Sequence, residues 1–205
     1  MDDQVLAGMA RWPNVPAVFG WLALNRRGNW LLQGEPIENP IVTAYIGRNY
    51  ERDDAGRWFF QNGPQRVFIE LEYTPFVYRA TNASHHPLKI ETHTGKPVAK
   101  LRGAWIDEEG ALLLESEHGI GVLHDRDLDS ALPALLDANG TPLPEDALEK
   151  LMSLLQHGRA APVWLKLGEQ NVKVDSIRSS EVPARFRYTR TPAEPSPQKT
   201  VAADR

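Results

Sequence analysis

The chain has 205 residues, of which 41% are hydrophobic and 24% are charged, as in ordinary globular proteins. It contains no cysteine, which excludes disulfides, thiolate metal sites and cysteine nucleophiles and fits a reducing compartment. Its formal net charge is −4, whereas proteins that bind duplex nucleic acid usually carry a clear basic excess, so nucleic acid is disfavoured as a partner.

The N-terminal residues are acidic where a secretory signal peptide would be basic, and their apolar runs are too short for its hydrophobic core. The sequence also lacks the roughly 20 consecutive apolar residues that cross a membrane. We therefore expect a soluble, cytoplasmic protein of bacterial type that does not contact a membrane.

The N-terminal part of the chain predicts two short helices and a hairpin. An amphipathic pattern predicts a helix over residues 2–11. Two apolar runs, 18–24 and 30–32, are joined by a short link that contains glycine, which is typical of a β-hairpin. Asn39 followed by proline has the pattern of a helix N-cap and predicts a helix over about residues 41–50.

Strands follow this helix. Residues 57–60 and 66–73 predict two strands joined by a turn of Gln, Asn, Gly and Pro. In the second strand, apolar residues at 67, 69 and 71 alternate with Phe68, Glu70 and Glu72, which indicates one buried face. Residues 76–78 could extend the same sheet.

The second half of the chain predicts further hairpins. We expect strands near 88–92, 99–106, 111–115, 121–123, 163–167 and 172–177. A short helix is expected over residues 126–132 and the clearest amphipathic helix over 145–157. The polar composition after residue 191 predicts a disordered tail.

Four segments share the pattern Asx-x-x-Gly: residues 25–28, 53–56, 107–110 and 137–140. The physical interpretation is a turn in which the Asx side chain bonds to nearby backbone and glycine adopts a positive φ. A calcium loop would need several more oxygen ligands and a late glutamate, so we interpret the pattern as repeated turn chemistry.

Together these elements predict an α+β fold, with mainly short antiparallel β-hairpins and three to four short helices. We expect two small packed units, residues 1–83 and 84–190, followed by the tail 191–205. Hairpins are expected because the links are too short for parallel crossovers.

Arginines, amides and aromatic residues are concentrated between residues 48 and 66. Arginine binds carboxylates and phosphates through its planar fork, and aromatic rings stack on bases or guanidinium groups. The candidate ligand-binding or partner-binding residues are Arg48, Asn49, Tyr50, Arg57, Trp58, Gln61, Asn62 and Arg66. The alternative is structural, with the arginines paired to neighbouring carboxylates such as Asp53 and Glu70.

A second group of residues predicts a different chemistry. His85, His86, Glu91 and His93 could hold zinc and support a metal-assisted hydrolase, although histidines in this loop-like region are more often solvated. Serine-hydrolase, dinucleotide-binding and Walker A patterns are missing from the sequence. The sequence therefore predicts no cofactor and fixes no catalytic residue.

Several segments resemble an uncharacterised bacterial family of about this length, a domain of unknown function. They are residues 11–16, 20–24, 28–30, 48–50, 56–67 and 182–186, so the likeness spans residues 9–188. The resemblance implies no established activity. We expect a non-enzymatic binding or accessory protein that recognises a protein partner or an anionic small ligand, with a metal-assisted hydrolase and single-strand nucleic-acid binding as alternatives.

Overall fold

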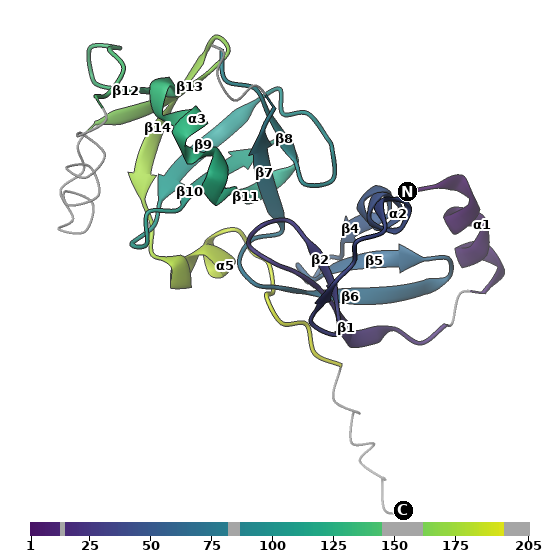
Figure 1. The fold of residues 1–205 in the computed structure, drawn as a ribbon. Coiled ribbons are helices and arrows are strands. Elements are labelled where there is room, and N and C mark those ends of the chain that lie inside the picture. Colours follow the sequence, from purple (N-terminus) through teal and green to yellow (C-terminus); the bar gives the residue numbers. More distant parts are fainter. Residues whose placement is uncertain (13–14, 82–86, 145–161, 195–205) are drawn as a thin grey trace, which may run out of the picture.

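The fold was obtained as a computed structural model that describes residues 1–12, 15–81, 87–144 and 162–194. Two mixed β-sheets form its framework (Figure 1). The smaller sheet contains β1 (Val18–Leu24), β2 (Trp30–Leu32), β3 (Glu35–Pro36), β4 (Tyr50–Arg52), β5 (Trp58–Asn62) and β6 (Gln65–Leu71), in the order β3-β2-β1-β6-β5-β4.

The larger sheet has eight strands in the order β12-β13-β14-β9-β10-β11-β7-β8. They are β7 (Phe76–Ala80), β8 (Ile90–Thr92), β9 (Leu101–Ile106), β10 (Leu112–Ser116), β11 (Gly119–Leu123), β12 (Leu135–Leu136), β13 (Val163–Leu167) and β14 (Gln170–Ser176). Described helices are α1 (Asp3–Arg11), α2 (Pro40–Arg48), α3 (Leu128–Ala131) and α5 (Val182–Arg185), with 3-10 turns at Asp125–Asp127, Leu132–Ala134 and Ser179–Glu181.

The predicted α+β fold, dominated by antiparallel pairs, is confirmed. Neighbouring strands in the chain form hairpins, as in β1–β2, β5–β6, β9–β10 and β13–β14. Three parallel pairs, β1–β6, β7–β11 and β9–β14, were not predicted. The prediction of hairpins considered only the short links between consecutive strands. Each parallel pair joins strands that are separated by other elements, so that argument does not apply to them.

The repeated Asx-x-x-Gly segments form the predicted turns. The Oδ1 atom of Asn25 accepts hydrogen bonds from the backbone N–H groups of Arg27 and Asn29. Oδ1 of Asp107 accepts in the same way from residues two and four positions later. Gly28 and Gly110 have φ values of 80° and 86°, a backbone conformation that residues with a Cβ atom rarely adopt. These turns place charged side chains at the ends of the hairpins.

Both faces of β6 carry buried residues, which differs from the predicted single buried face. Ile69 and Leu71 lie in the main core. Phe68 is also buried, because its ring stacks on Phe19 at 4.6 Å and contacts Phe59 edge-on at 5.8 Å. Aromatic residues from three adjacent strands therefore cover the face that the alternation assigned to solvent.

An aromatic cluster joins the two sheets into one continuous core. Trp30 and Tyr50 of the smaller sheet are in contact, with ring centroids 5.2 Å apart. Phe76 of β7 packs against Tyr50 and against Trp58 of β5. His93, just after β8, contacts the ring of Trp30 at 5.1 Å. Contacts between aromatic rings therefore make the core continuous from one sheet to the other.

The C-terminal part of the chain returns from the larger sheet to the smaller one (Figure 1). The N–H of Thr189 donates to the carbonyl of Gly56, and the N–H of Leu71 donates to the carbonyl of Arg190. The Arg190 guanidinium also donates to the carbonyls of Leu71 and Glu72. Residues 187–190 thus hold the end of β6, where the chain leaves the smaller sheet.

Along the chain, the change of sheet falls between Leu71 and Phe76. The division into units 1–83 and 84–190 stays a prediction. The predicted helix over 145–157 and residues 195–205 of the predicted tail lie outside the described residues. Within the described ranges, no helix is long and apolar enough to cross a membrane.

Candidate functional site

A cleft lies where the end of the β1–β2 hairpin meets the larger sheet. Its cavity volume is about 390 Å³. The turn at residues 25–28 and Glu72 form one side, and the turn at 107–110, the start of β10 and the end of β11 form the other. The lining side chains include Arg26, Arg27, Glu72, Glu109, Ala111, Val122, Leu123, Asp125 and Leu128.

Arg26 crosses this cleft from the smaller sheet to the larger one. Its NH1 atom donates to Oε2 of Glu109 at 2.7 Å, and its NH2 atom lies 3.8 Å from Oδ2 of Asp107. The guanidinium also lies over the ring of Tyr73, with its CZ atom 4.5 Å from the centroid. Two carboxylates and one aromatic face therefore fix the position of a single arginine.

Arg27 makes a second bridge beside the first. Its Nε and NH2 atoms donate to Oδ2 of Asp125 at 3.3 and 2.9 Å. The two side chains are 55% and 53% exposed, so solvent screens this pair strongly. The hydrogen bond from Arg27 lowers the pKa of Asp125, which therefore stays ionised.

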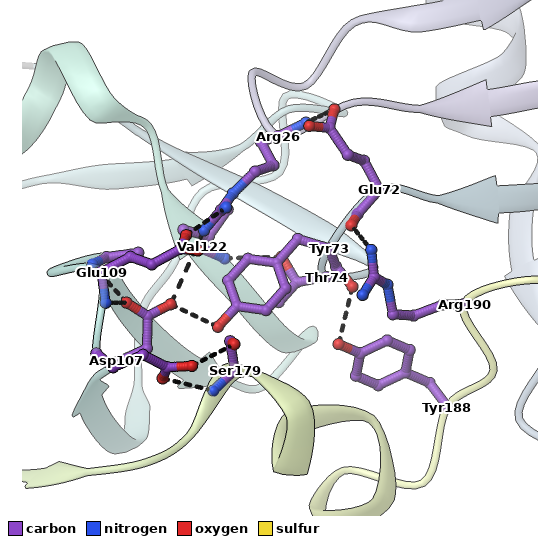
Figure 2. A network of polar contacts seen from close by, with 12 residues as sticks. Arg26, Glu72, Tyr73, Thr74, Asp107, Glu109, Val122, Ser179, Tyr188 and Arg190 are labelled. Atoms are coloured by element: carbon purple, nitrogen blue, oxygen red, sulfur yellow. Dashed lines mark hydrogen bonds and ion pairs between the residues drawn. The ribbon is translucent and has the colours of Figure 1, made fainter.

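Glu72 lacks a basic side-chain partner among the residues that the structure describes. Its Oε2 atom accepts a hydrogen bond from the backbone N–H of Arg26 at 3.0 Å (Figure 2). The side chain is exposed at the edge of the cleft. Its charge is therefore left without a cation, unlike the charges of Glu109 and Asp125.

The side of the cleft formed by the larger sheet also carries apolar side chains. Val122 and Leu123 at the end of β11 are buried, and Leu128 at the start of α3 is half-buried. Val122 is fixed by its backbone, because its N–H donates to Oγ1 of the buried Thr74 at 2.9 Å. The cleft thus combines charged groups from the hairpin turns with a rigid hydrocarbon surface.

A hydrogen-bond network underlies the cleft and joins three segments of the chain (Figure 2). Tyr73 donates its hydroxyl hydrogen to Oδ2 of Asp107 at 2.7 Å. The carbonyl of Tyr73 in turn accepts from the hydroxyl of Tyr188 at 2.8 Å. Burial and, to a smaller extent, the hydrogen bond to Asp107 raise the pKa of Tyr73 well above its usual range. Tyr73 therefore remains a neutral donor and holds the buried carboxylate.

The structure separates the sequence-predicted residues 48–66 into several environments. Arg48 pairs with Asp2 at the start of α1, through Nε and Oδ1 at 3.3 Å. Asn49 is fully buried, and its amide donates to the carbonyl of Tyr45 while its Oδ1 accepts from the N–H of Asp2. These two residues join α1 to the end of α2.

Arg57 and Arg66 both lie over phenylalanine rings of the smaller sheet. Arg57 stacks on Phe68 and pairs with Asp53 at 2.7 Å. Arg66 stacks on Phe59 at 4.7 Å, and no carboxylate pairs with it within the described part of the chain. Of this pair of arginines, Arg66 is the one whose guanidinium is open to a partner.

Four further residues of the predicted block lie in the core or in a turn. Tyr50 and Trp58 are buried, and the Tyr50 hydroxyl donates to the carbonyl of Pro75. Gln61 is buried and donates its amide to the carbonyl of Gly63. Asn62 is exposed at the end of β5. The block thus does not form one surface, and its role in binding stays a prediction.

The residues of the metal alternative are only partly described. His85 and His86 lie outside the described residues, and no group of three or more possible metal ligands occurs among the described ones. The His93 Nδ1 atom accepts from the N–H of Val77 at 3.3 Å, and its Nε2 atom is inaccessible to solvent. Burial, with a smaller effect of Lys96, lowers the pKa of His93 to about 3.

Sequence reasoning did not assign a binding role to Arg26, Arg27, Glu109 or Asp125. A pattern that could have found Arg26 and Glu109 was present, because two of the Asx-x-x-Gly turns carry opposite charges. Residues 26 and 27 are arginines, whereas residues 108 and 109 are glutamates. Opposite charge alone could have suggested that these two turns pair. It could not have shown that a cleft lies between them.

The fold is of the α+β class, with two mixed sheets that meet at a charged cleft. The chain belongs to a family described as "Protein of unknown function (DUF2946)", which it matches over residues 1–193. The family description assigns no activity. The predicted membership of an uncharacterised protein family is therefore confirmed.

Two solved structures resemble the chain. A DUF1285 family protein from Silicibacter pomeroyi DSS-3 matches with a TM-score of 0.52 and 15% identity, covering 78% of this chain and 82% of the other. A DUF1285 family protein from Shewanella baltica OS155 gives a TM-score of 0.38 and 18% identity over 52% of this chain and 85% of its own. The first likeness concerns the fold alone. No match was found among curated proteins.

Proposed function

We propose that the protein is a non-enzymatic binding protein and that the cleft between the sheets holds a small charged ligand. The supporting observation is a cavity of about 390 Å³ whose lining combines charged side chains from both sheets with apolar side chains at the end of β11 and the start of α3. Ligand sites are commonly cavities of this size, with apolar walls and a few orienting polar groups, at the junction of two structural units.

The protonation states in the cleft support binding over acid–base catalysis. A general acid or base works best with a pKa near the working pH. Burial is the largest single influence and lowers the pKa of Arg26, but the hydrogen bond to Glu109 and the charges of Glu109 and Asp107 together raise it. The pKa of Asp125 is lowered by Arg27. Both groups are thus kept ionised, which suits recognition of a charged ligand.

A cavity-filling substitution tests this proposal. Ala111→Phe places a ring in the cleft, whereas Ala17→Phe adds the same ring at an exposed position outside the cavity lining. Native mass spectrometry of the full chain would be run with amines, carboxylates and amino acids as separate probes. We expect saturable binding of at least one class, lost in Ala111→Phe and kept in Ala17→Phe. Equal binding by both variants would place the site elsewhere.

Arg66 supports a second candidate, recognition of an acidic protein partner. Its guanidinium is exposed and held on Phe59, and arginine and aromatic residues are enriched among interface residues with large binding energies. Affinity capture would compare Arg66→Ala with Arg102→Ala, an exposed arginine on β9. A partner that both variants retain would contradict this candidate.

The lack of cysteine fits a reducing compartment, and we place either role in the cytoplasm.

A further inference from the structure

The charges of the cleft do not balance. Arg26 is shared between Glu109 and the buried Asp107, and Arg27 is paired with Asp125. Glu72 adds a further carboxylate, which among the described residues has only a backbone N–H as its partner. Two guanidinium groups of the lining thus face three lining carboxylates and the buried Asp107 beneath them, while the guanidinium of Arg190 lies at the backbone carbonyl of Glu72. A ligand that places a positive charge beside Glu72 would be attracted to this excess of negative charge.

The Arg27–Asp125 pair can exchange partners at little cost. Exposed ion pairs of this kind contribute little to stability, since water solvates both groups when they separate. The carboxylate of a ligand could therefore replace Asp125 on the guanidinium fork of Arg27, while Asp125 keeps its contacts with the Arg126 N–H and with His124. Arg26 is less able to exchange, because one of its partners, Asp107, is completely buried.

The remaining surface of the cleft is hydrocarbon. Val122, Leu123 and Leu128 line it opposite the turn at 25–28, together with Ala111. An ammonium at Glu72 and a carboxylate at Arg27 would leave the body of a small ligand facing this wall. Burial of an aliphatic side chain there would add to the attraction between the charges.

Extending the proposed function, on which this inference rests, we propose that the cleft binds a free α-amino acid with an apolar side chain. Glu72 accepts hydrogen bonds from its ammonium group, Arg27 donates to its carboxylate, and the β11–α3 wall contacts its side chain. No covalent step is involved. Glu72 and Arg27 thereby select a ligand whose ammonium and carboxylate groups are attached to the same carbon atom.

Three ligands of nearly equal shape test the charge requirement by isothermal titration calorimetry on the full chain. L-Leucine carries both charges, L-leucinamide only the ammonium, and 4-methylpentanoate only the carboxylate. We expect leucine to bind most tightly, leucinamide about ten-fold more weakly, as for the loss of one charge-assisted hydrogen bond, and 4-methylpentanoate most weakly. Tighter binding of 4-methylpentanoate than of leucinamide would overturn the proposal.

Two variants separate the roles of the charged residues. Glu72→Gln keeps an oxygen acceptor for the Arg26 N–H and should weaken leucine and leucinamide alike. Arg27→Gln should weaken leucine about ten-fold and leave leucinamide unchanged. Glu70→Gln is the matched control, because it removes the same charge from β6 outside the cleft lining. An equal effect of Glu70→Gln and Glu72→Gln would overturn the assignment of Glu72.

The outcomes also separate this inference from the proposed function. Suppose that leucine does not bind, but another probe binds and Ala111→Phe abolishes its binding. The cleft is then a ligand site, but the amino-acid assignment is wrong. If no probe class binds in that manner, both proposals fail. Unchanged unfolding midpoints of the variants, measured in parallel, show that any loss of binding is not a loss of fold.

Discussion

Tyr73 and Asp107 are joined by a hydrogen bond of 2.7 Å between a buried hydroxyl and a buried carboxylate. Tyr73 lies in the connector between the sheets, and Asp107 begins the turn that follows β9. The other oxygen of Asp107 already accepts two backbone N–H groups within its own turn. The stability of the carboxylate in the protein interior therefore depends on Tyr73 and Arg26.

Tyr73→Phe is expected to lower the free energy of unfolding by about 1–3 kcal/mol, because it leaves a buried charged acceptor without its donor. Tyr188→Phe is the matched variant, since it removes the same hydroxyl from a bond to a neutral carbonyl. Urea denaturation should show the larger loss for Tyr73→Phe. A loss no larger than that of Tyr188→Phe would indicate that water replaces the missing donor.

Gly56→Ala should destabilise the fold by more than Gly140→Ala. Both glycines close Asx-x-x-Gly turns, with φ values of 79° and 77°, so an added methyl group causes similar backbone strain. At Gly56, however, the new Cβ would lie 2.3 Å from the carbonyl oxygen of Arg187, whereas at Gly140 it meets no atom within 4 Å. The difference between the two melting temperatures measures the contact with the returning C-terminal segment. Equal melting temperatures would mean that this segment moves away freely.

Acid should destabilise the protein through His93. Its pKa is about 3 in the fold and about 6.5 in an unfolded chain, so between these values the unfolded state binds more protons. The stability contributed by neutral His93 is complete above pH 6.5 and is lost as the pH falls toward 3, at up to about 1.4 kcal/mol per pH unit. His93→Gln should flatten the pH dependence of unfolding between pH 6.5 and 5. A slope equal to that of the unsubstituted protein would show that another group titrates there.

The two arginines of the smaller sheet should differ in their effect on stability. Arg57→Ala breaks a half-buried pair with Asp53 as well as the contact with Phe68, whereas Arg66→Ala loses only an exposed contact with Phe59. We expect losses of about 1 kcal/mol and about 0.5 kcal/mol, respectively. Thermal unfolding of the two variants measures the difference. The reverse order would mean that the Arg57–Asp53 pair does not stabilise the fold.

Local chemistry made much of the fold predictable. The predicted N-cap at Asn39 is confirmed, because its side chain accepts hydrogen bonds from the N–H groups of Ile41 and Val42. The hairpins around the Asx-x-x-Gly turns followed in the same way, since a turn needs only a few neighbouring residues. Such features depend on nearby sequence and are therefore visible in it.

Features that depend on distant residues were not predictable in this way. The alternation in β6 assigned Phe68 to solvent, because the sequence alone does not show that Phe19 and Phe59 lie beside it. The cleft requires two turns that are about 80 residues apart in the chain. No local sequence pattern shows that these turns lie side by side in the fold.

The returning segment at residues 187–190 has a consequence for biosynthesis. The strand β6 and the turn at Gly56 form part of their final contacts only with Thr189 and Arg190, more than 110 residues later in the chain. During translation, the smaller sheet is synthesised first but is completed last. It should therefore remain open to proteases and chaperones until residues 187–190 have emerged from the ribosome.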